Sequence, residues 1–378
     1  MTPLEKISPL GYDSVFTNTM PMDNSAKDFL RNLLTTPSVT GFEEPVQQLV
    51  RDYIAPFADS VRTDIHGNVI AVRNPSNGAA AECRVMLAGH CDQIGLIVNY
   101  IDKEGYIYVQ TVGGWDIQNL IGIRVKIWSA KGPVDGVIGK KPIHLMDDDD
   151  RKKVPKIKDL WVDIGAKDKE EAETIVSIGD PITVELEYRE LRNDLIAAPA
   201  TDDKAGVWVV MEALRRIDPA KLKVTVFAVS TVQEEVGIRG AMTSAYGIEP
   251  HIGIATDVTF ATDCPTIEKK ENGDVKLGGG PVITRSPNMT TKLVNALVDV
   301  AKQHEIPVQI VAEGKVSGTD ARAMQVSRSG MATALISIPN RYMHTPVEVI
   351  SLSDIDRIAD LMARYCESID PSVSYVPE

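Results

Sequence analysis

The feature that most constrains the fold is the hydrophobic pattern, which changes character twice along the chain. From about residue 196 onward, patterns of helical period alternate with short apolar runs that are typical of strands. Such alternation predicts a doubly wound α/β sheet. Residues 25–57 carry two more helical patterns, and an apolar run at 85–88 predicts a buried strand that ends at Gly89 and His90. The α/β pattern therefore occupies both ends of the chain.

Between these two parts lies a stretch of β-like runs. From about 94 to 190 the runs are short and are separated by Gly, Asp and Lys clusters, as in a small all-β domain. The acidic and basic run 147–153 is most simply a solvated loop within this stretch. We therefore predict one α/β domain, built from residues 1–93 and 191–378, with an inserted β-rich domain at 94–190.

Composition and charge narrow the possible partners. The chain has 378 residues, enough for two domains, and a formal net charge of -13. Nucleic acids and anionic membranes attract an excess of Lys and Arg, so neither is expected as a partner. The four cysteines are widely spaced without a CxxC pair, which predicts reduced thiols. The first two dozen residues lack an apolar run of signal-peptide length, and we expect a cytoplasmic protein.

Acidic and histidine residues follow the apolar runs of the α/β parts at several places. The segments are Gly89-His90-Cys91-Asp92, Thr201-Asp202-Asp203-Lys204, Gln233-Glu234-Glu235-Val236, Thr256-Asp257 and Arg341-Tyr342-Met343-His344-Thr345-Pro346. Ligands of open α/β sheets bind beyond the carboxyl ends of the strands. Carboxylates gathered there would oppose one another's ionisation, and divalent cations remove that cost. Three carboxylates and two neutral imidazoles around two dications leave a charge of about +1, so the pattern predicts a two-metal centre.

The first two segments also have plain structural explanations. A single histidine such as His90 is usually a surface or core residue. Asp92, two residues later, would point to the same side of an extended chain and accept the second ring N–H of His90. Asp203 and Lys204 are explained by the start of a helix. Asp202 then remains as the candidate carboxylate that bridges both metals.

Each of the other segments alone is a weak indication of a metal centre, and together they are a stronger one. Glu234 and Glu235 close an apolar run, where their side chains would diverge, so that one binds metal and the other serves as a base. Two exposed glutamates are the alternative. Asp257 has an alternative as a turn residue, and His344 is a weak signal alone. A metal centre explains all of these residues at once.

Taken together, these segments resemble the M42 family of metallo-aminopeptidases, which includes TET aminopeptidases, glutamyl aminopeptidases and proteins misnamed endoglucanases. The resemblance extends from about residue 25 to 368. The matching segments begin at His90, Ala200, Val232, Arg239, Asp257, Gly318 and His344. This sequence departs from the common Met-Asp-Glu after the first histidine, having Cys91, Asp92 and Gln93 instead.

The resemblance implies two ligand sets that share one carboxylate: His90, Asp202 and Asp257 on one metal, and Asp202, Glu235 and His344 on the other. It places Glu234 at the catalytic base and Asp92 at the carboxylate that orients His90. It also implies a co-catalytic-zinc peptidase fold whose inserted PDZ-like domain mediates dimer contacts. Two divalent ions per subunit are expected, zinc first, with cobalt or manganese as alternatives. The expected partners are peptides with a free N-terminus and further copies of the chain, in a dimer or a dodecamer.

The function that these residues predict is metal-dependent removal of N-terminal residues from peptides. Two dications would activate a water molecule, and Glu234 would accept its proton. A related two-metal amidohydrolase, such as a deacylase or deblocking peptidase, would use much the same ligands. An endoglucanase would need Glu234, a second carboxylate at roughly 5–9 Å and no metal, which leaves His90, Asp257 and His344 without a role.

Overall fold

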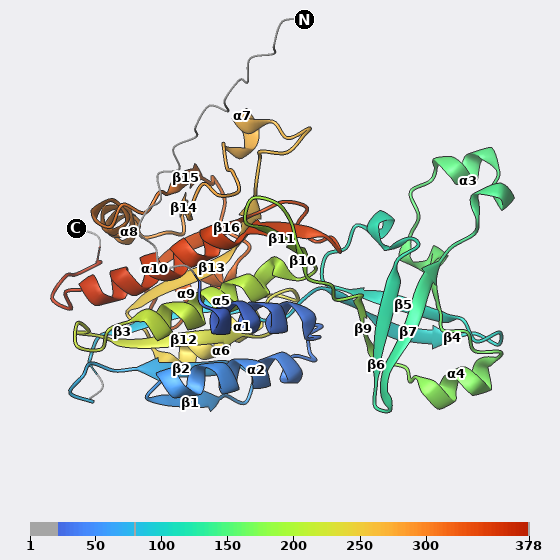
Figure 1. The fold of residues 1–378 in the computed structure, drawn as a ribbon, viewed down its shortest axis with the longest axis horizontal. Helices are drawn as coiled ribbons and strands as arrows, with labels where there is room; N and C mark the ends of the chain where they lie inside the picture. The colour runs from blue at the N-terminus through green and yellow to red at the C-terminus, as the bar shows by residue number, and fades with distance from the viewer. Residues whose placement is uncertain (1–21, 79–80, 377–378) are drawn as a thin grey trace, which may run out of the picture.

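The computed structural model describes residues 22–78 and 81–376. Residues 1–21, whose sequence lacks an apolar run of signal-peptide length, lie outside the described residues. Figure 1 shows a larger α/β part beside a smaller part made mostly of strands. In the ranges that the structure describes, no helix has the length and apolar character needed to cross a membrane.

The α/β part is built on a mixed sheet of eight strands in the order β1-β2-β12-β3-β13-β16-β14-β15. Its strands are β1 (Ser60–Thr63), β2 (Val69–Arg73), β3 (Arg84–His90), β12 (Thr225–Thr231), β13 (Ile252–Phe260), β14 (Val282–Arg285), β15 (Gln309–Ala312) and β16 (Ala332–Asn340). The central strands β12, β3, β13 and β16 are mutually parallel. Because helices cover both faces, these strands are almost continuously apolar, and β3 is buried from Val85 to His90.

Helices pack on both faces of this sheet, which confirms the doubly wound α/β fold. One layer contains α1 (Asn24–Thr35), α2 (Glu44–Ile54), α5 (Thr201–Arg216), α8 (Thr291–Gln303) and α10 (Leu352–Ser368), and the other contains α6 (Arg239–Ile248) and α9 (Asp320–Gln325). Local sequence explains their starts and faces. Asp23 caps α1 by accepting a hydrogen bond from the backbone N–H of Ala26, and Phe29, Leu30 and Leu33 form its buried face.

The β-rich insertion is a closed six-stranded barrel, as the all-β expectation requires. Its strands are β4 (Gly95–Ile101), β5 (Ile107–Val112), β6 (Arg124–Ser129), β7 (Gly132–Gly139), β8 (Trp161–Asp163) and β9 (Pro181–Val184). Alternating side chains such as Val125 and Ile127 fill a hydrophobic core that is separate from the core of the α/β part. The limits 94 and 190 of the inserted domain stay a prediction.

Two segments of the all-β insertion are helical. The run that we expected to be a solvated loop contains α3 (Asp148–Lys152), and α4 (Lys169–Ile175) follows later. Both begin with an Asp whose side chain accepts a hydrogen bond from the backbone, Asp147 for α3 and Asp168 for α4. Capping and the acidic first turn outweigh the high charge of α3.

The remaining elements connect these parts. A small sheet joins β10 (Arg189–Glu190), β11 (Leu195–Ala198) and β17 (Glu348–Ser351). The short helix α7 (Lys269–Asn272) and the 3-10 turns η1 (Ala55–Phe57), η2 (Ile117–Leu120), η3 (Ile143–Leu145) and η4 (Ile157–Asp159) complete the fold. The pairing of β11 with β17 matters for the site, because β11 ends four residues before Asp202 and β17 begins four residues after His344.

Candidate active site

The parallel strands place the predicted residues at one edge of the sheet. β3 ends at His90, and Asp257 lies in the carboxyl-terminal half of β13. β12 ends at Thr231, and the two glutamates Glu234 and Glu235 follow three and four residues later. The carboxyl ends of parallel neighbours meet at the same edge, so residues far apart in the chain converge there.

Two more predicted residues reach this edge from other elements. Asp202 is the second residue of α5, and the peptide bond between Asp202 and Asp203 is cis. His344 lies in the loop between β16 and β17. Asp203 turns away from the cluster and accepts hydrogen bonds from the backbone N–H groups of His90 and Gly206, at 3.2 and 3.1 Å. It therefore acts at the helix start, as the sequence indicated.

The five predicted ligands form two groups that share Asp202. One group contains His90, Asp202 and Asp257, and the other contains Asp202, Glu235 and His344; the ligand atoms of each group lie within 4.8 Å of one another. The two oxygens of Asp202 face different histidines, each 3.2 Å from a ring Nε2. The structure thus brings together all five residues, and the exact role of each stays a prediction.

The electrostatics of the cluster fit two dications. Burial, together with neighbouring carboxylates, raises the pKa of Asp257 and of Glu235 to about 8. The hydrogen bond to Asp202 raises the pKa of His344 to about 9. Without cations, raised pKa values favour neutral carboxyl groups at Asp257 and Glu235 and a positively charged imidazolium at His344. Divalent ions bound between these oxygens and nitrogens would supply the missing positive charge.

Glu234 lies beside the ligands but in neither group. Its Oε2 is 3.9 Å from Nε2 of His90, and its side chain is 12% exposed. Burial raises the pKa of Glu234 to about 10. Our expectation that a strand conformation separates the two glutamates was wrong, because they stand in a turn where Gln233 has a positive φ and the carbonyl of Glu234 accepts from Gly237 and Ile238. The turn still directs the two carboxylates toward different histidines.

Asp92 makes more backbone contacts than the sequence suggested. Nδ1 of His90 is 3.0 Å from the main-chain oxygen of Asp92 and 3.5 Å from its carboxylate. The carboxylate itself accepts hydrogen bonds from the backbone N–H of Glu234 at 2.9 Å, the N–H of Glu235 at 3.2 Å and the hydroxyl of Thr40 at 2.8 Å. Asp92 therefore holds the glutamate turn as well as the first histidine.

Sequence reasoning missed two contacts. Glu348, four residues after His344, accepts hydrogen bonds from the backbone of both Asp202 and His344. Gly114, in the loop after β5 of the barrel, has its carbonyl oxygen 2.8 Å from Nδ1 of His344. A glutamate four residues after a predicted histidine ligand was a weak signal for the first contact. A backbone carbonyl leaves no signal in the sequence for the second.

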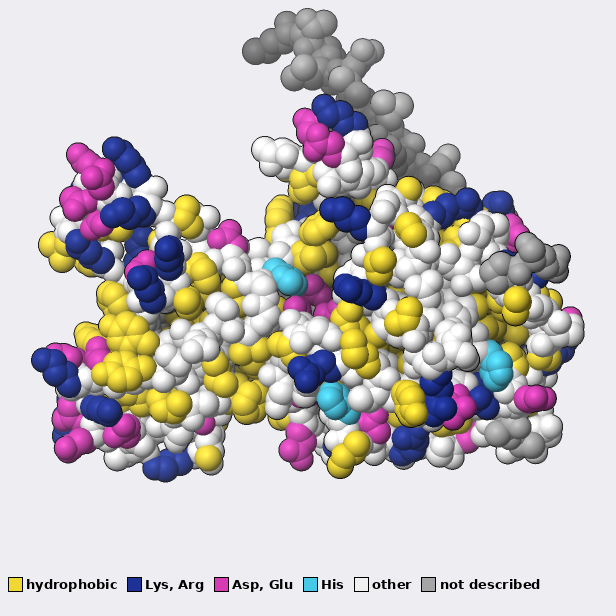
Figure 2. Space-filling model, turned by 180° about the vertical axis from the view of Figure 1, so that it is seen from behind, with side chains coloured by type: hydrophobic (Ala, Val, Ile, Leu, Met, Phe, Trp, Pro, Cys, Tyr) yellow, Lys and Arg dark blue, Asp and Glu magenta, His cyan; other side chains and the backbone are white. Residues whose placement is uncertain are grey.

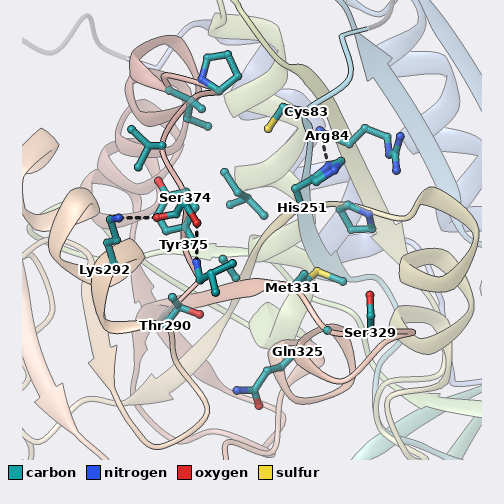
Figure 3. A pocket seen from close by; sticks show the side chains of 18 of the residues that line it. Cys83, Arg84, His251, Thr290, Lys292, Gln325, Ser329, Met331, Ser374 and Tyr375 are labelled. Carbon is teal, nitrogen blue, oxygen red and sulfur yellow. Dashed lines mark hydrogen bonds between the residues drawn. The ribbon is translucent and has the colours of Figure 1, made fainter. Parts of the chain in front are cut away.

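The shape of the molecular surface is consistent with a site at this edge of the sheet. Figure 2 shows a histidine and several acidic side chains in the hollow between the barrel and the α/β part. A much larger hollow of about 1510 Å³ lies elsewhere, around His251 and Lys292, and contains none of the predicted ligands. Figure 3 shows that its walls include Arg84 and the C-terminal segment near Tyr375. Arg84 and Ile252 begin β3 and β13, so this hollow is at the opposite edge of the sheet, and its size does not make it the active site.

Comparisons with known proteins agree with this geometry. The model of the M42 glutamyl aminopeptidase family matches residues 67–361. The chain is 36% identical to the lysyl aminopeptidase of Pyrococcus furiosus, over 91% of this chain and 97% of that protein. Its fold is similar to that of a TET aminopeptidase from a marine sediment Thaumarchaeota archaeon, with a TM-score of 0.87, 34% identity and coverage of 92% and 97%. It is also similar to the TET1 peptidase of Pyrococcus horikoshii, with a TM-score of 0.80, 30% identity and coverage of 91% and 100%.

Proposed function

This chain belongs to the M42 glutamyl aminopeptidase family and is a peptide-bond hydrolase, and from that premise we propose that it removes N-terminal residues from peptides by two-metal catalysis with Glu234 as general base. The observation that carries the proposal is the pair of ligand groups joined by Asp202. One carboxylate between two histidine-containing groups is the arrangement that a co-catalytic metal pair requires.

The chain's own residues would divide the chemical work. When bound, the two divalent ions would acidify a water molecule and polarise the scissile carbonyl group. Glu234, adjacent to the first group but outside it, would accept the proton of the attacking water at Oε2 and deliver it to the departing amine. His90 and His344 each direct Nδ1 to a main-chain oxygen, which leaves Nε2 facing the carboxylates.

The charge of the site favours a substrate with a free amino terminus. The charges of Asp257 and Glu235 would be offset by the metals they hold, so Glu234, which is in neither ligand group, or a metal ion with an open coordination position would hold the amine. An acylated terminus carries neither a charge nor a basic lone pair. Imidazole and carboxylate ligands accept Zn²⁺, Co²⁺ and Mn²⁺, and we propose zinc as the native ion.

We further propose that the protein works as a homo-oligomer, at least a dimer, through its barrel. The TET1 peptidase of Pyrococcus horikoshii, whose fold matches 91% of this chain, can assemble into a tetrahedron or a large octahedral shell. The protruding barrel presents the exposed hydrophobic side chains Ile143, Leu145 and Val154.

Metal removal combined with paired substrates tests the function. Chelation should abolish hydrolysis, and Zn²⁺, Co²⁺ or Mn²⁺ should restore it to different degrees. A peptide with a free amino terminus should lose one residue at a time, whereas its N-acetylated twin should stay intact; mass spectrometry of the products checks both. Efficient release of residues from the acetylated peptide would instead indicate a deblocking amidohydrolase. Cleavage of a β-glucan in the presence of chelator would contradict the metallopeptidase mechanism.

A further inference from the structure

A buried glutamate connects two of the metal-ligand segments. Glu348 is the first residue of β17 and is only 2% exposed. Its Oε2 accepts hydrogen bonds from the backbone N–H of Asp202 at 3.0 Å and from the hydroxyl of Thr201 at 2.8 Å. Its Oε1 accepts from the backbone N–H of His344 at 2.8 Å. One side chain therefore fixes the backbone at both the shared carboxylate and the second histidine.

These contacts require a carboxylate rather than any side chain of similar shape. Both oxygens of Glu348 face donors, and each is an acceptor only. A glutamine in the same position would turn an NH₂ group toward either the N–H of Asp202 or that of His344. The buried N–H facing that amide would lose its partner, which moves the segment or leaves a polar group unpaired.

We propose that Glu348 is a positioning residue that sets the placement of Asp202 and His344 and thereby the affinity of the ligand group Asp202, Glu235 and His344. This inference rests on the proposed two-metal function. It gives Glu348 the same task for these two segments that Asp92 performs for the glutamate turn. Glu348 has no place among the ligand atoms of either group, so it acts through the residues it holds.

The surrounding hydrogen bonds indicate that the Glu348 side chain positions the ligand segments and is not needed for the sheet itself to form. β17 pairs with β11 in antiparallel register, with Glu348 opposite Ala198, and this pairing does not depend on the glutamate side chain. The hydroxyl of Thr201, which donates to Glu348, accepts a hydrogen bond from the amide of Asn340 at 2.9 Å. Loss of the carboxylate should therefore shift the ligand segments within a sheet that still forms.

The test compares Glu348→Gln with a matched variant of a carboxylate outside both ligand groups, Asp354→Asn. Asp354 is also buried and accepts two backbone N–H groups, those of Gly278 and Gly280. Metal-free protein is titrated with Co²⁺ and followed by visible absorption and calorimetry, and metal-free melting curves are recorded alongside. Wild type and Asp354→Asn should each bind two equivalents. Glu348→Gln should bind one equivalent about 10–100-fold more weakly, the usual cost of losing an outer-shell partner.

A second pair of variants keeps the test valid if Glu348→Gln fails to fold. Thr201→Val removes one of the donors to Glu348, whereas Thr201→Ser retains the hydroxyl. Weaker Co²⁺ binding in Thr201→Val with recovery in Thr201→Ser supports the inference. Unchanged Co²⁺ affinity in both Glu348→Gln and Thr201→Val, or equal weakening in Asp354→Asn, overturns it. Failure of the wild type to bind two equivalents would instead contradict the proposed function.

Discussion

At the scale of single residues, Glu234 and Glu235 carry the same carboxylate group but have different surroundings. Glu235 belongs to a ligand group, with Oε1 3.5 Å from Nε2 of His344. Glu234 belongs to neither group and is hydrogen-bonded to Asp92 only through its backbone. A base must be free to take up and release a proton, whereas a metal ligand must stay deprotonated. The two positions therefore predict different results from the same substitution.

Glu234→Gln should keep the fold and both metals while lowering kcat by about 10²–10⁴-fold, the range of general acid–base catalysis. Glu235→Gln should lose metal instead. Steady-state kinetics together with metal content measured by mass spectrometry separate the two effects. Near-normal turnover of Glu234→Gln with full metal content would show that another group is the base.

At the scale of elements, buried carboxylates join segments that the chain supplies from different places. Asp92 connects the end of β3, the turn after β12 and the segment around Thr40. In that segment Val39 forms a parallel β-bridge with Gln93. The strands set the approximate positions of these segments. The hydrogen bonds of Asp92 set their final spacing, because its oxygens accept three donors from two segments.

Asp92→Asn should weaken metal affinity or activity by roughly 10–100-fold. The asparagine amide would place an NH₂ group against backbone N–H donors of the glutamate turn. Thr40→Val is a graded comparison, because it removes one donor and leaves the two backbone hydrogen bonds; its effect should be smaller. Metal titration and kinetics of both variants provide the check. Wild-type values for Asp92→Asn in both measurements would limit Asp92 to a structural role.

At the scale of the whole molecule, the barrel is connected to the site as well as to the fold. It has its own core, separate from that of the α/β part. Yet the carbonyl of Gly114 receives the Nδ1 hydrogen bond of His344, and a Cβ at this glycine would lie 3.3 Å from the same nitrogen. An inserted domain that was expected only to mediate assembly also contacts a predicted ligand.

Replacing residues 94–190 by a short linker should leave a folded α/β domain that is monomeric, as insertions with their own core permit. The contact between Gly114 and His344 adds a second expectation: the remaining domain should bind metal more weakly, because His344 loses the acceptor that fixes its ring. Sedimentation and metal titration measure the two effects separately. An unaltered assembly state would show that the barrel does not mediate oligomerisation.

The sequence by itself determined the α/β alternation, the position of the all-β insertion and the seven candidate site residues. These follow from local rules: hydrophobic period identifies helices such as α10 and strands such as β5, and polar residues after buried strands mark one edge of a parallel sheet. Short elements with few apolar residues, such as α3 and β17, carried too little of this signal to be found.

Only the tertiary structure decided which oxygen faces which nitrogen. The two oxygens of Asp202 point to histidines at opposite ends of the chain, and Glu348 and Gly114 hold groups from which they are separated by four to 230 residues. Hydrogen-bond partners depend on distances of a few ångström between separate segments, and several of them are backbone atoms that every residue type possesses. The sequence identifies the predicted metal ligands, whereas packing of the barrel and the strands against one another sets the geometry in which these side chains can act.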